Sequence, residues 1–223
     1  MPGPRGDHSA RPPPLDQVPL SELLRALAEH GEARFFAKGR TLIREGEAGQ
    51  SLYIILSGRL RAYSEDEFGQ RRVVYGEYLP GEFLGEMSLD GGVRSATVTA
   101  IEASWCVHVT RPTLERHLAA HPAFAFELLA KVIRRARSAT LSMRAIALND
   151  VYGRIAWLLN SRAVPGPGDT RVLPERLTHQ ALADQLGCTR PMVSRVMKEL
   201  ATGGYLVDEG GELRLLKPLP QRF

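Results

Sequence analysis

The spacing of apolar side chains changes along the chain, and each change predicts a different kind of structure. Leucines at positions 20, 23, 24 and 27 fall on one face of a helix, and Gly31 is placed to end it. Beyond it, short apolar runs such as 52–56, 71–75 and 96–100 are separated by glycines, ten of which fall between positions 39 and 92. Turn signals about every 8–12 residues are typical of an antiparallel barrel or jelly-roll, so we expect a mainly β domain over residues 33–110.

A long helix is predicted over residues 122–149, where no glycine and no further proline interrupts the chain. Its apolar residues recur at alternating spacings of three and four, which places them along one seam of a helix about 40 Å long. We predict that two copies of the chain dimerise along this seam; packing of the helix on its own β domain is the alternative. The seam residues are Leu129, Val132, Ala136, Ala139, Met143 and Ile146.

Two short helices are predicted near the C-terminus, over residues 178–186 and from 190 to about 202. A helix–turn–helix needs a small residue in its first helix, a turn residue that tolerates positive φ, and apolar residues at the crossing. Ala183 and Gly187 supply the first two. A hairpin with a glycine turn over 205–216 would form a wing. The crossing residues are Leu182, Leu186, Val193 and Val196.

Charge is distributed unevenly along the 223 residues. Residues 1–130 carry 14 Lys or Arg against 17 Asp or Glu, whereas residues 131–223 carry 15 against 8. Concentrated positive charge in the second part indicates a polyanionic partner, because neutralising phosphates releases condensed counterions. A solvated basic face is the alternative.

The remaining composition excludes several classes of protein. No apolar run is long enough for a membrane span, and the N-terminus lacks the apolar core of a secretory signal, so we expect a cytoplasmic protein without a membrane partner. The first 18 residues, with five prolines among the first 14, are expected to form a disordered tail that adds nothing to the core. Two distant cysteines, Cys106 and Cys188, offer neither a disulfide framework nor a zinc or iron–sulfur site.

The stretch from Phe83 to Ala96 contains the parts needed to hold a cyclic phosphate. Backbone N–H groups at a short helical turn and the Ser95 hydroxyl can donate to phosphate oxygens, while the Arg94 guanidinium supplies paired donors and a permanent charge. Glu86 can accept from a sugar hydroxyl. The alternative is that Glu86 and Arg94 simply pair with each other at a turn.

From about Leu20 the chain resembles the family of the cyclic-AMP receptor protein and the fumarate-nitrate reductase regulator. The resemblance rests on GEAGQSLYIILSGRLRAY, PGEFLGEMSL with VRSATV, DVYGRIAWLL, and LTHQALADQLGCTRPMVSRVMKELATGGYL. It implies a bacterial, homodimeric transcription regulator that is not an enzyme, with an α+β fold. We expect an N-terminal antiparallel, jelly-roll-like β-roll sensor over 19–121, a dimerisation helix over 122–149 and a C-terminal winged helix–turn–helix over 150–223.

The resemblance also implies a cyclic nucleotide effector between β-roll and dimer helix. Cyclic AMP is the first candidate. Cyclic GMP, cyclic di-GMP or no ligand remain open, because Ala139 replaces one of two hydroxyl residues that meet adenine and the loop from Glu86 to Arg94 is two residues shorter. An N-terminal cysteine cluster and a haem-type histidine motif are missing, so no metal is expected. The predicted ligand residues are Gly85, Glu86, Met87, Ser88, Arg94, Ser95, Arg135 and Thr140.

For DNA, the resemblance implies base contacts from Arg190 and Arg195 with Ser194 close by, and Pro191 stands where many members carry a glutamate. Thr178 and Thr189 are placed to cap the two helices. A dimer should read a two-fold-related site with half-sites about 34 Å apart, and RNA polymerase is a further candidate partner of an activator. The predicted DNA residues are Thr178, Gln180, Thr189, Arg190, Met192, Ser194, Arg195 and Lys198.

Two rival functions remain open. The first is a ligand-independent DNA-binding regulator of the same family whose nucleotide cassette is vestigial. The second is a cupin-like metalloenzyme, which needs a cluster of His and Glu on the barrel strands. Only His108 falls on a predicted strand.

Overall fold

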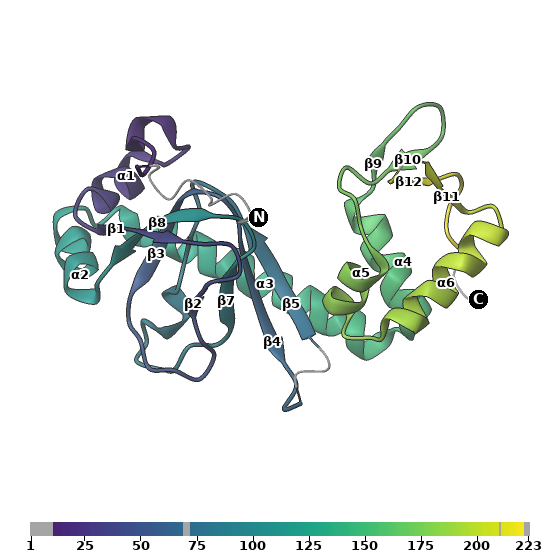
Figure 1. The fold of residues 1–223 in the computed structure, drawn as a ribbon, viewed down its shortest axis with the longest axis horizontal. Helices are drawn as coiled ribbons and strands as arrows, with labels where there is room; N and C mark the ends of the chain where they lie inside the picture. Colours follow the sequence, from purple (N-terminus) through teal and green to yellow (C-terminus); the bar gives the residue numbers. More distant parts are fainter. Residues whose placement is uncertain (1–10, 69–71, 210, 221–223) are drawn as a thin grey trace, which may run out of the picture. The chain divides into compact units, whose positions relative to one another are not determined.

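The computed structural model describes residues 11–68, 72–209 and 211–220, and for residues 145–148 the helical backbone without the side chains. The chain divides into two compact units (Figure 1). The first comprises Met1–Ser64 and Tyr75–Ile133, and the second comprises Glu65–Val74 and Arg134–Phe223. Within the part of the chain that is described, no helix is long and apolar enough to cross a lipid bilayer.

Two four-stranded antiparallel sheets form the β-roll predicted for the N-terminal part. The first has the order β1-β8-β3-β6 and the second β2-β7-β4-β5. The strands of the first are β1 (Glu32–Phe36), β8 (Ser104–Val109), β3 (Leu52–Ser57) and β6 (Phe83–Leu84). Those of the second are β2 (Thr41–Ile43), β7 (Thr97–Ala100), β4 (Leu60–Glu65) and β5 (Arg72–Tyr78).

Strand β3 is apolar on both faces because it contributes to two cores. Its alternate residues Leu52, Ile54 and Leu56 pack with the helices, while Tyr53 and Ile55 belong to the cluster between the two sheets. Side chains of a strand alternate between its faces, so an uninterrupted apolar run is what a strand covered on both sides requires.

The helical layer of the first unit comprises α1 (Glu22–Ala28) and α2 (Arg111–Ala120), which are preceded by the 3-10 turn η1 (Leu15–Gln17). Ser21 caps α1 by accepting a hydrogen bond from the Leu24 N–H at 3.1 Å. The expectation that residues 1–18 add nothing to the core is wrong at its end: Val18 is 3% exposed, and Leu15 packs on the same cluster. These apolar side chains lie next to α1 in sequence and are covered with it. Residues 1–10 lie outside the described residues.

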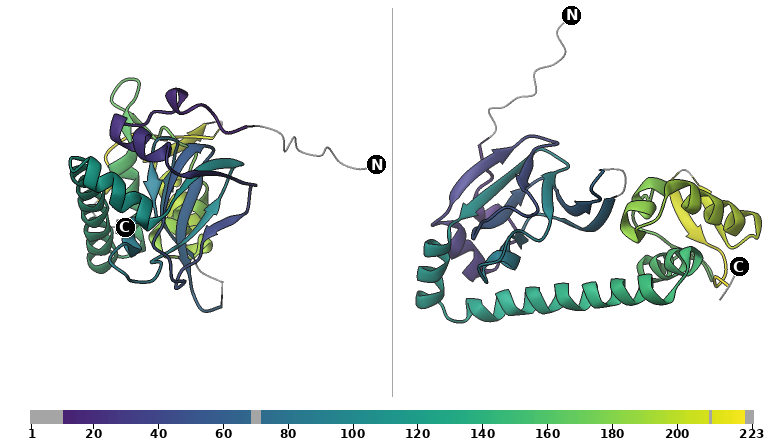
Figure 2. Two further views of the ribbon diagram at one scale, coloured as in Figure 1. Left: turned by 90° about the vertical axis from the view of Figure 1, so that its left-hand side faces the viewer. Right: turned by 90° about the horizontal axis from the view of Figure 1, so that it is seen from below.

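Helix α3 (Phe124–Leu148) is continuous, as Figure 2 shows. Phe124 anchors its beginning, fully buried against Phe83 and His117. The Lys131 ammonium pairs with Glu82, and Ser21 donates to Glu127 at 2.8 Å. These contacts fix the first turns of α3 to the β-roll.

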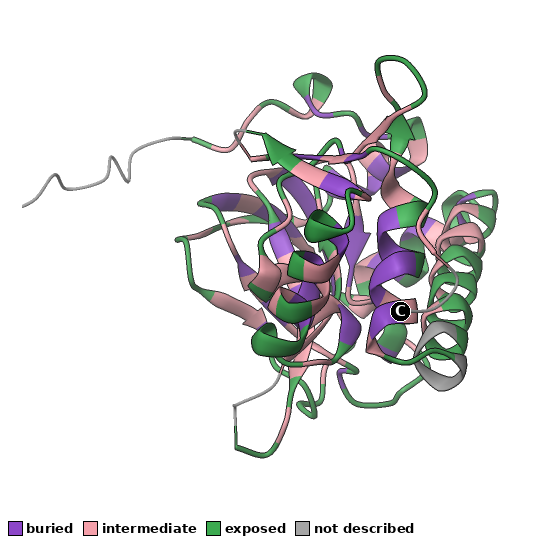
Figure 3. Cartoon of the chain, turned by 90° about the vertical axis from the view of Figure 1, so that its right-hand side faces the viewer, coloured by how far each residue is buried: buried purple, intermediate pink, exposed green. Residues whose placement is uncertain are grey.

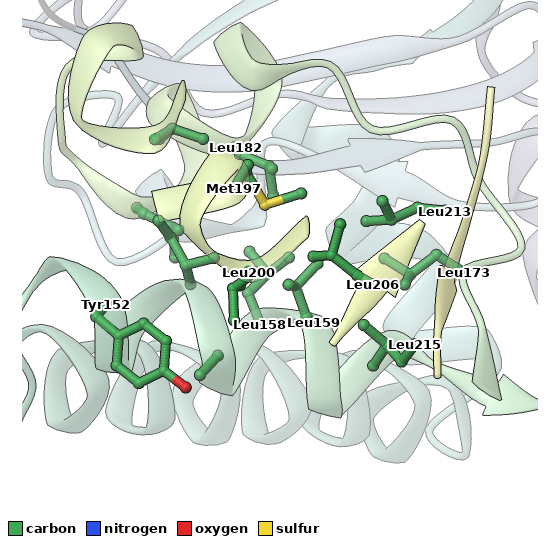
Figure 4. Close-up of a cluster of buried hydrophobic side chains, with 14 of the residues drawn as sticks. Tyr152, Leu158, Leu159, Leu173, Leu182, Met197, Leu200, Leu206, Leu213 and Leu215 are labelled. Carbon is green, nitrogen blue, oxygen red and sulfur yellow. The ribbon is translucent and has the colours of Figure 1, made fainter. Parts of the chain in front are cut away.

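Beyond α3, the second unit consists of helices and a small sheet. It contains α4 (Val151–Arg162), α5 (His179–Leu186) and α6 (Arg190–Thr202), and its core is shown in Figure 4. The sheet has the order β11-β12-β10-β9. Its strands are β9 (Val164–Pro165), β10 (Arg171–Val172), β11 (Leu206–Glu209) and β12 (Glu212–Leu215). The β11–β12 hairpin is the predicted wing; the two strands that complete its sheet were not predicted.

Candidate functional site

The first candidate site begins where β6 ends. Gly85 has φ 98° and starts the 3-10 turn η2 (Glu86–Ser88). A Cβ at this position would lie 2.5 Å from the Ser51 carbonyl oxygen and 2.9 Å from Nη1 of Arg94. Glycine is therefore required twice, by the left-handed backbone and by the close approach of a neighbouring loop.

Arg94 is the centre of this site, and its side chain is 7% exposed. Nη1 donates to the carbonyl oxygens of Gly85 at 2.8 Å and Ser51 at 3.0 Å, and to the Ser88 hydroxyl at 2.9 Å. Nη2 donates to the Ser51 carbonyl at 3.1 Å and to the Ser51 hydroxyl at 2.9 Å. The guanidinium is thus held in one orientation by two segments of the chain, the η2 turn with its cap and the loop at Ser51.

All of these partners are neutral oxygens. The hydrogen bonds that hold Arg94 thus come from the backbone and from serine hydroxyls, and the effect of Glu86 on Arg94 is electrostatic. Burial lowers the pKa of Arg94, while Tyr53 and the buried Glu86 act in the opposite direction. A buried cation whose hydrogen bonds all go to neutral oxygens is electrostatically suited to an anion.

The other predicted ligand residues of this unit differ in exposure. Ser88 is 1% exposed, and its hydroxyl donates to the Gly49 carbonyl at 2.5 Å. Met87 and Ser95 are exposed, and neither contributes to the hydrogen bonds around Arg94. The structure thus brings together Gly85, Glu86, Ser88 and Arg94.

Sequence reasoning missed the loop that faces this site, residues 49–51. Gly49 and Ser51 hold Ser88 and Arg94, while the Gln50 amide oxygen accepts from Nη1 of Arg111 at 2.9 Å. Arg111 also donates to the Leu89 carbonyl at 3.2 Å, so the start of α2 is joined to the end of the η2 turn. We name residues 49–51 the Arg94 loop. Its glycine and polar residues carry no periodic signal that would have marked it.

Arg135 and Thr140, the remaining predicted ligand residues, lie on α3 within the second unit. Thr140 is exposed, and its hydroxyl donates to the Ala136 carbonyl at 3.0 Å. Arg135 is half-buried. Their approach to a ligand at Arg94 stays a prediction.

The second candidate site is the helix–turn–helix formed by α5 and α6. Gly187 ends α5 with φ 61°, and Nη1 of Arg154 on α4 donates to the Leu186 carbonyl at 3.0 Å. Thr178 caps α5, since its hydroxyl accepts from the Ala181 N–H at 3.0 Å. Thr189 occupies the corresponding position of α6, but its hydroxyl makes no capping hydrogen bond, so that prediction is wrong. At the crossing, Leu182, Leu186 and Val193 are buried and Val196 is partly buried.

Helix α6 presents a polar face opposite its buried side. Arg190, Met192 and Lys198 are exposed, as are Thr178, Gln180 and Thr189 before and at the start of the two helices. The Arg195 side chain is 83% exposed and lies 3.4 Å from Glu199, a weak pair that a stronger acceptor can replace. The Gln180 amide donates to Asp184 at 2.7 Å.

Ser194 is the exception on this face, because it is half-buried and already engaged. Its hydroxyl lies 2.9 Å from Nδ1 of His179, which joins α6 to the first residue of α5. The sequence pattern did not single out His179. The contact spans 15 positions and depends on how the two helices cross.

A third feature is the apolar seam of α3. Leu129, Val132 and Met143 are 54%, 38% and 66% exposed. Ala136 and Ala139 are also exposed, and Figure 3 shows most of this helix in the exposed colour. Phe126 and Ile133, which the sequence pattern omitted, extend the same stripe at 75% and 54% exposure. The side chain of Ile146 lies outside the described residues.

No group of three or more His, Cys, Asp or Glu side chains is placed to hold a metal ion in the described part of the chain. Cys106 is buried in the β-roll, and burial raises its pKa to about 12. Neither Cys106 nor Cys188 belongs to a metal-binding group among the described residues.

Comparison with known proteins matches both sites to domain families. Residues 33–121 match the cyclic nucleotide-binding domain, and residues 153–218 match the Crp-like helix-turn-helix domain. The chain is 32% identical over 176 residues to the cyclic AMP receptor protein of Thermus thermophilus, and this alignment covers 78% of this chain and 79% of that protein. It is also 32% identical over 178 residues to the cAMP-activated global transcriptional regulator CRP of Escherichia coli, covering 76% and 82%.

Solved structures show the same architecture. The catabolite activator protein of Thermus thermophilus is 28% identical with a TM-score of 0.53, covering 90% of this chain and 92% of that one. The c-di-GMP responsive global regulator CLP of Xanthomonas campestris shares the fold, with a TM-score of 0.73, 24% identity, and 87% and 98% of the two chains covered.

Proposed function

Because the chain belongs to the family of the cyclic-AMP receptor protein and the fumarate-nitrate reductase regulator, we propose that it is a homodimer whose DNA affinity is controlled by a cyclic nucleotide bound at Arg94. Membership makes it a DNA-binding transcription regulator with a cyclic nucleotide-binding domain, and not an enzyme. The ligand, the assembly and the mode of control form the proposal.

The proposal of a nucleotide ligand is supported chiefly by the buried guanidinium of Arg94, which is hydrogen-bonded only to neutral oxygens. A phosphate would bring negative charge into direct contact with the guanidinium and accept from the same Nη groups, with bonds stronger than those to neutral acceptors. Glu86, which is buried in the η2 turn, is suited to accept a hydrogen bond from the ribose hydroxyl. Ser95 supplies an exposed hydroxyl next to Arg94 in sequence.

Cyclic AMP is the first ligand to test, because the Thermus thermophilus and Escherichia coli relatives carry cyclic AMP in their names. Cyclic GMP and cyclic di-GMP are the alternatives. Regulation needs only that the ligand bind more tightly to one of two packings of α3. Thr140 and Arg135 are the residues of α3 that we propose contact the ligand. Whichever nucleotide binds, the linkage between ligand and DNA is reciprocal.

A second candidate is a ligand-independent regulator. Two observations favour it: Ala139 offers no hydroxyl beside Thr140, and both Nη groups of Arg94 already have acceptors within the chain. In that protein Arg94 is a structural residue of the β-roll. Its replacement then affects folding and leaves DNA binding intact.

We propose that two copies pair along the exposed apolar stripe of α3. Leu129, Val132 and Met143 would leave water on association, and the exposed Ala136 and Ala139 permit close helix approach. Pairing gives the two α6 helices a two-fold relation, which suits a symmetric operator with half-sites about 34 Å apart.

On the DNA, Arg190 and Arg195 are the proposed base readers, since a guanidinium can give two hydrogen bonds to guanine in the major groove. Thr178, Gln180, Thr189 and Lys198 are proposed phosphate contacts, and Met192 an apolar contact. The regulator would act in the bacterial cytoplasm, with RNA polymerase as partner if it activates.

The experiment is calorimetric titration of the purified chain with cyclic AMP, cyclic GMP and cyclic di-GMP, followed by selection of DNA sites in each state. We expect saturable binding of one nucleotide and tighter DNA binding in its presence. Arg94→Ala should abolish the nucleotide effect, with Arg44→Ala, an exposed arginine, as the control.

The outcomes separate the two candidates. DNA binding that no nucleotide alters, with or without Arg94→Ala, supports the ligand-independent regulator. Failure to bind any double-stranded DNA at low salt overturns both.

A further inference from the structure

His179 is the first residue of α5, and its ring turns toward α6. Nδ1 lies 2.9 Å from the Ser194 hydroxyl, and the ring is half-buried. The described residues give no hydrogen bond to the other ring nitrogen, Nε2. The two nitrogens of an imidazole face in different directions, so a contact at Nδ1 leaves Nε2 pointing away from Ser194.

The surroundings of this pair are basic and exposed. Ser194 is four residues from both Arg190 and Lys198, so the three share one stripe along α6. Arg190 and Lys198 are exposed, as is Thr178, which precedes His179 in the chain. The ring therefore lies on the side of the helix–turn–helix that carries the cationic groups.

The hydrogen bond between His179 and Ser194 gives the two side chains different roles. When the Ser194 hydroxyl donates to Nδ1, the neutral ring carries its proton on Nε2 and can donate it to an external acceptor. A hydroxyl committed in this way has no proton left to donate to a base edge.

We propose that His179 is a DNA-phosphate contact of this regulator and that Ser194 is a positioning residue that fixes its tautomer, not a reader of bases. The inference rests on the proposed DNA binding of α5 and α6. A phosphate oxygen accepts from Nε2–H of His179, and Ser194 holds the ring at the orientation this contact needs. The contact adds affinity without adding sequence preference.

The test is a double-mutant cycle on a DNA site selected with the wild-type chain. His179→Ala should weaken binding about five-fold, the size expected for one hydrogen bond, and Ser194→Ala about two-fold. The double variant should bind like His179→Ala alone, because Ser194 acts only through the ring. Ser194→Thr, which keeps the hydroxyl, should restore binding. His121→Ala, an exposed histidine of the other unit, serves as the control.

A second readout is sequence preference, measured on the selected site and on variants with one base changed. His179→Ala should lower affinity equally for all of them. Thermal unfolding of each variant shows whether a loss reflects misfolding, and Ser194→Thr rescue is not expected from a merely packed side chain.

Additive losses in the cycle, or a changed base preference in Ser194→Ala, would show that Ser194 contacts DNA directly and would overturn the proposal. Wild-type affinity in His179→Ala would also overturn it. Absence of DNA binding by the wild-type chain is a different result, which refutes the proposed function itself.

Discussion

The guanidinium of Arg94 holds Ser51 by its backbone carbonyl, at 3.0 and 3.1 Å, and by its hydroxyl at 2.9 Å. The two residues are 43 positions apart, and their contact ties the Arg94 loop to the η2 turn. The segment that faces the proposed phosphate site is therefore held in place by contacts within the chain. Several measurable consequences depend on this contact and on those around it.

Gly85→Ala should destabilise the chain by about 2–5 kcal/mol, because a left-handed backbone is strained with a side chain and the new Cβ meets the Ser51 carbonyl at 2.5 Å. Gly39→Ala is the matched control, since it has a similar φ of 85° but nothing within 4 Å of the new Cβ. It should lose only about 1–2 kcal/mol from backbone strain. Urea unfolding measures both, and equal losses would show that the Ser51 approach is unimportant.

Thr178→Ala should lower the free energy of unfolding by about 0.5–2 kcal/mol, because the N–H of Ala181 loses its capping acceptor. Thr189→Ala should leave stability unchanged, since that hydroxyl caps nothing. If Thr189 contacts a phosphate, its variant instead weakens DNA binding. Denaturation and DNA titration of the two variants test this difference between a capping and a non-capping threonine. A large loss of stability in Thr189→Ala would contradict it.

Val132→Glu should convert a dimer to monomers, because two carboxylates would be buried without partners across a two-fold contact. We expect the dimer dissociation constant to rise at least about 100-fold. Leu141→Glu is the control: Leu141 is also exposed on α3, at 47%, but lies off the stripe. Sedimentation equilibrium distinguishes them, and a Val132→Glu chain that remains dimeric would rule out the α3 stripe as the interface.

Acid should destabilise the first unit through His117. Burial, with the charges of His121 and His30, lowers the pKa of His117 below its ordinary value of 6.5. Below that pH the unfolded chain takes up a proton that the folded chain does not, so the free energy of unfolding falls until the folded pKa is passed. The pKa of His108 is lowered too, chiefly by burial, and acts with the same sign.

His117→Gln should therefore make the fall in stability below about pH 6.5 shallower without removing it. Urea unfolding between pH 5 and 8 measures the slope. His30→Gln removes one of the charges that lower the pKa of His117, so it should reduce the fall in stability as well, by less than His117→Gln does. An identical slope in His117→Gln and the wild-type chain would show that the buried ring does not contribute.

The periodic elements could be predicted from sequence because local spacing determines them. The expected ranges 178–186 and 190–202 match α5 and α6 within one residue at each end, since Gly187 requires a left-handed turn and Pro191 suits a helix start. Val18 was misjudged because a lone apolar residue in a proline-rich segment shows no periodicity. Its burial depends on α1 and the sheet beneath it.

Long-range polar contacts account for most of what the sequence did not reveal. Arg94 was predicted to bind an anion, but its acceptors on Ser51 and Gly85 belong to segments whose proximity only the folded sheets establish. The contact between His179 and Ser194 likewise depends on the crossing of two helices. The sequence singled out Arg94, whose anion-binding role stays a prediction, and did not single out His179; in both cases the partner residues required the structure.

The neutral surroundings of Arg94 also bear on how long the protein survives. Any anion that binds the folded chain there, and not the unfolded one, slows the openings through which proteases act. If the proposed nucleotide binds there, a cell that runs short of it would lose the regulator by degradation as well as its activity. Nucleotide supply would set the abundance of the protein along with its occupancy.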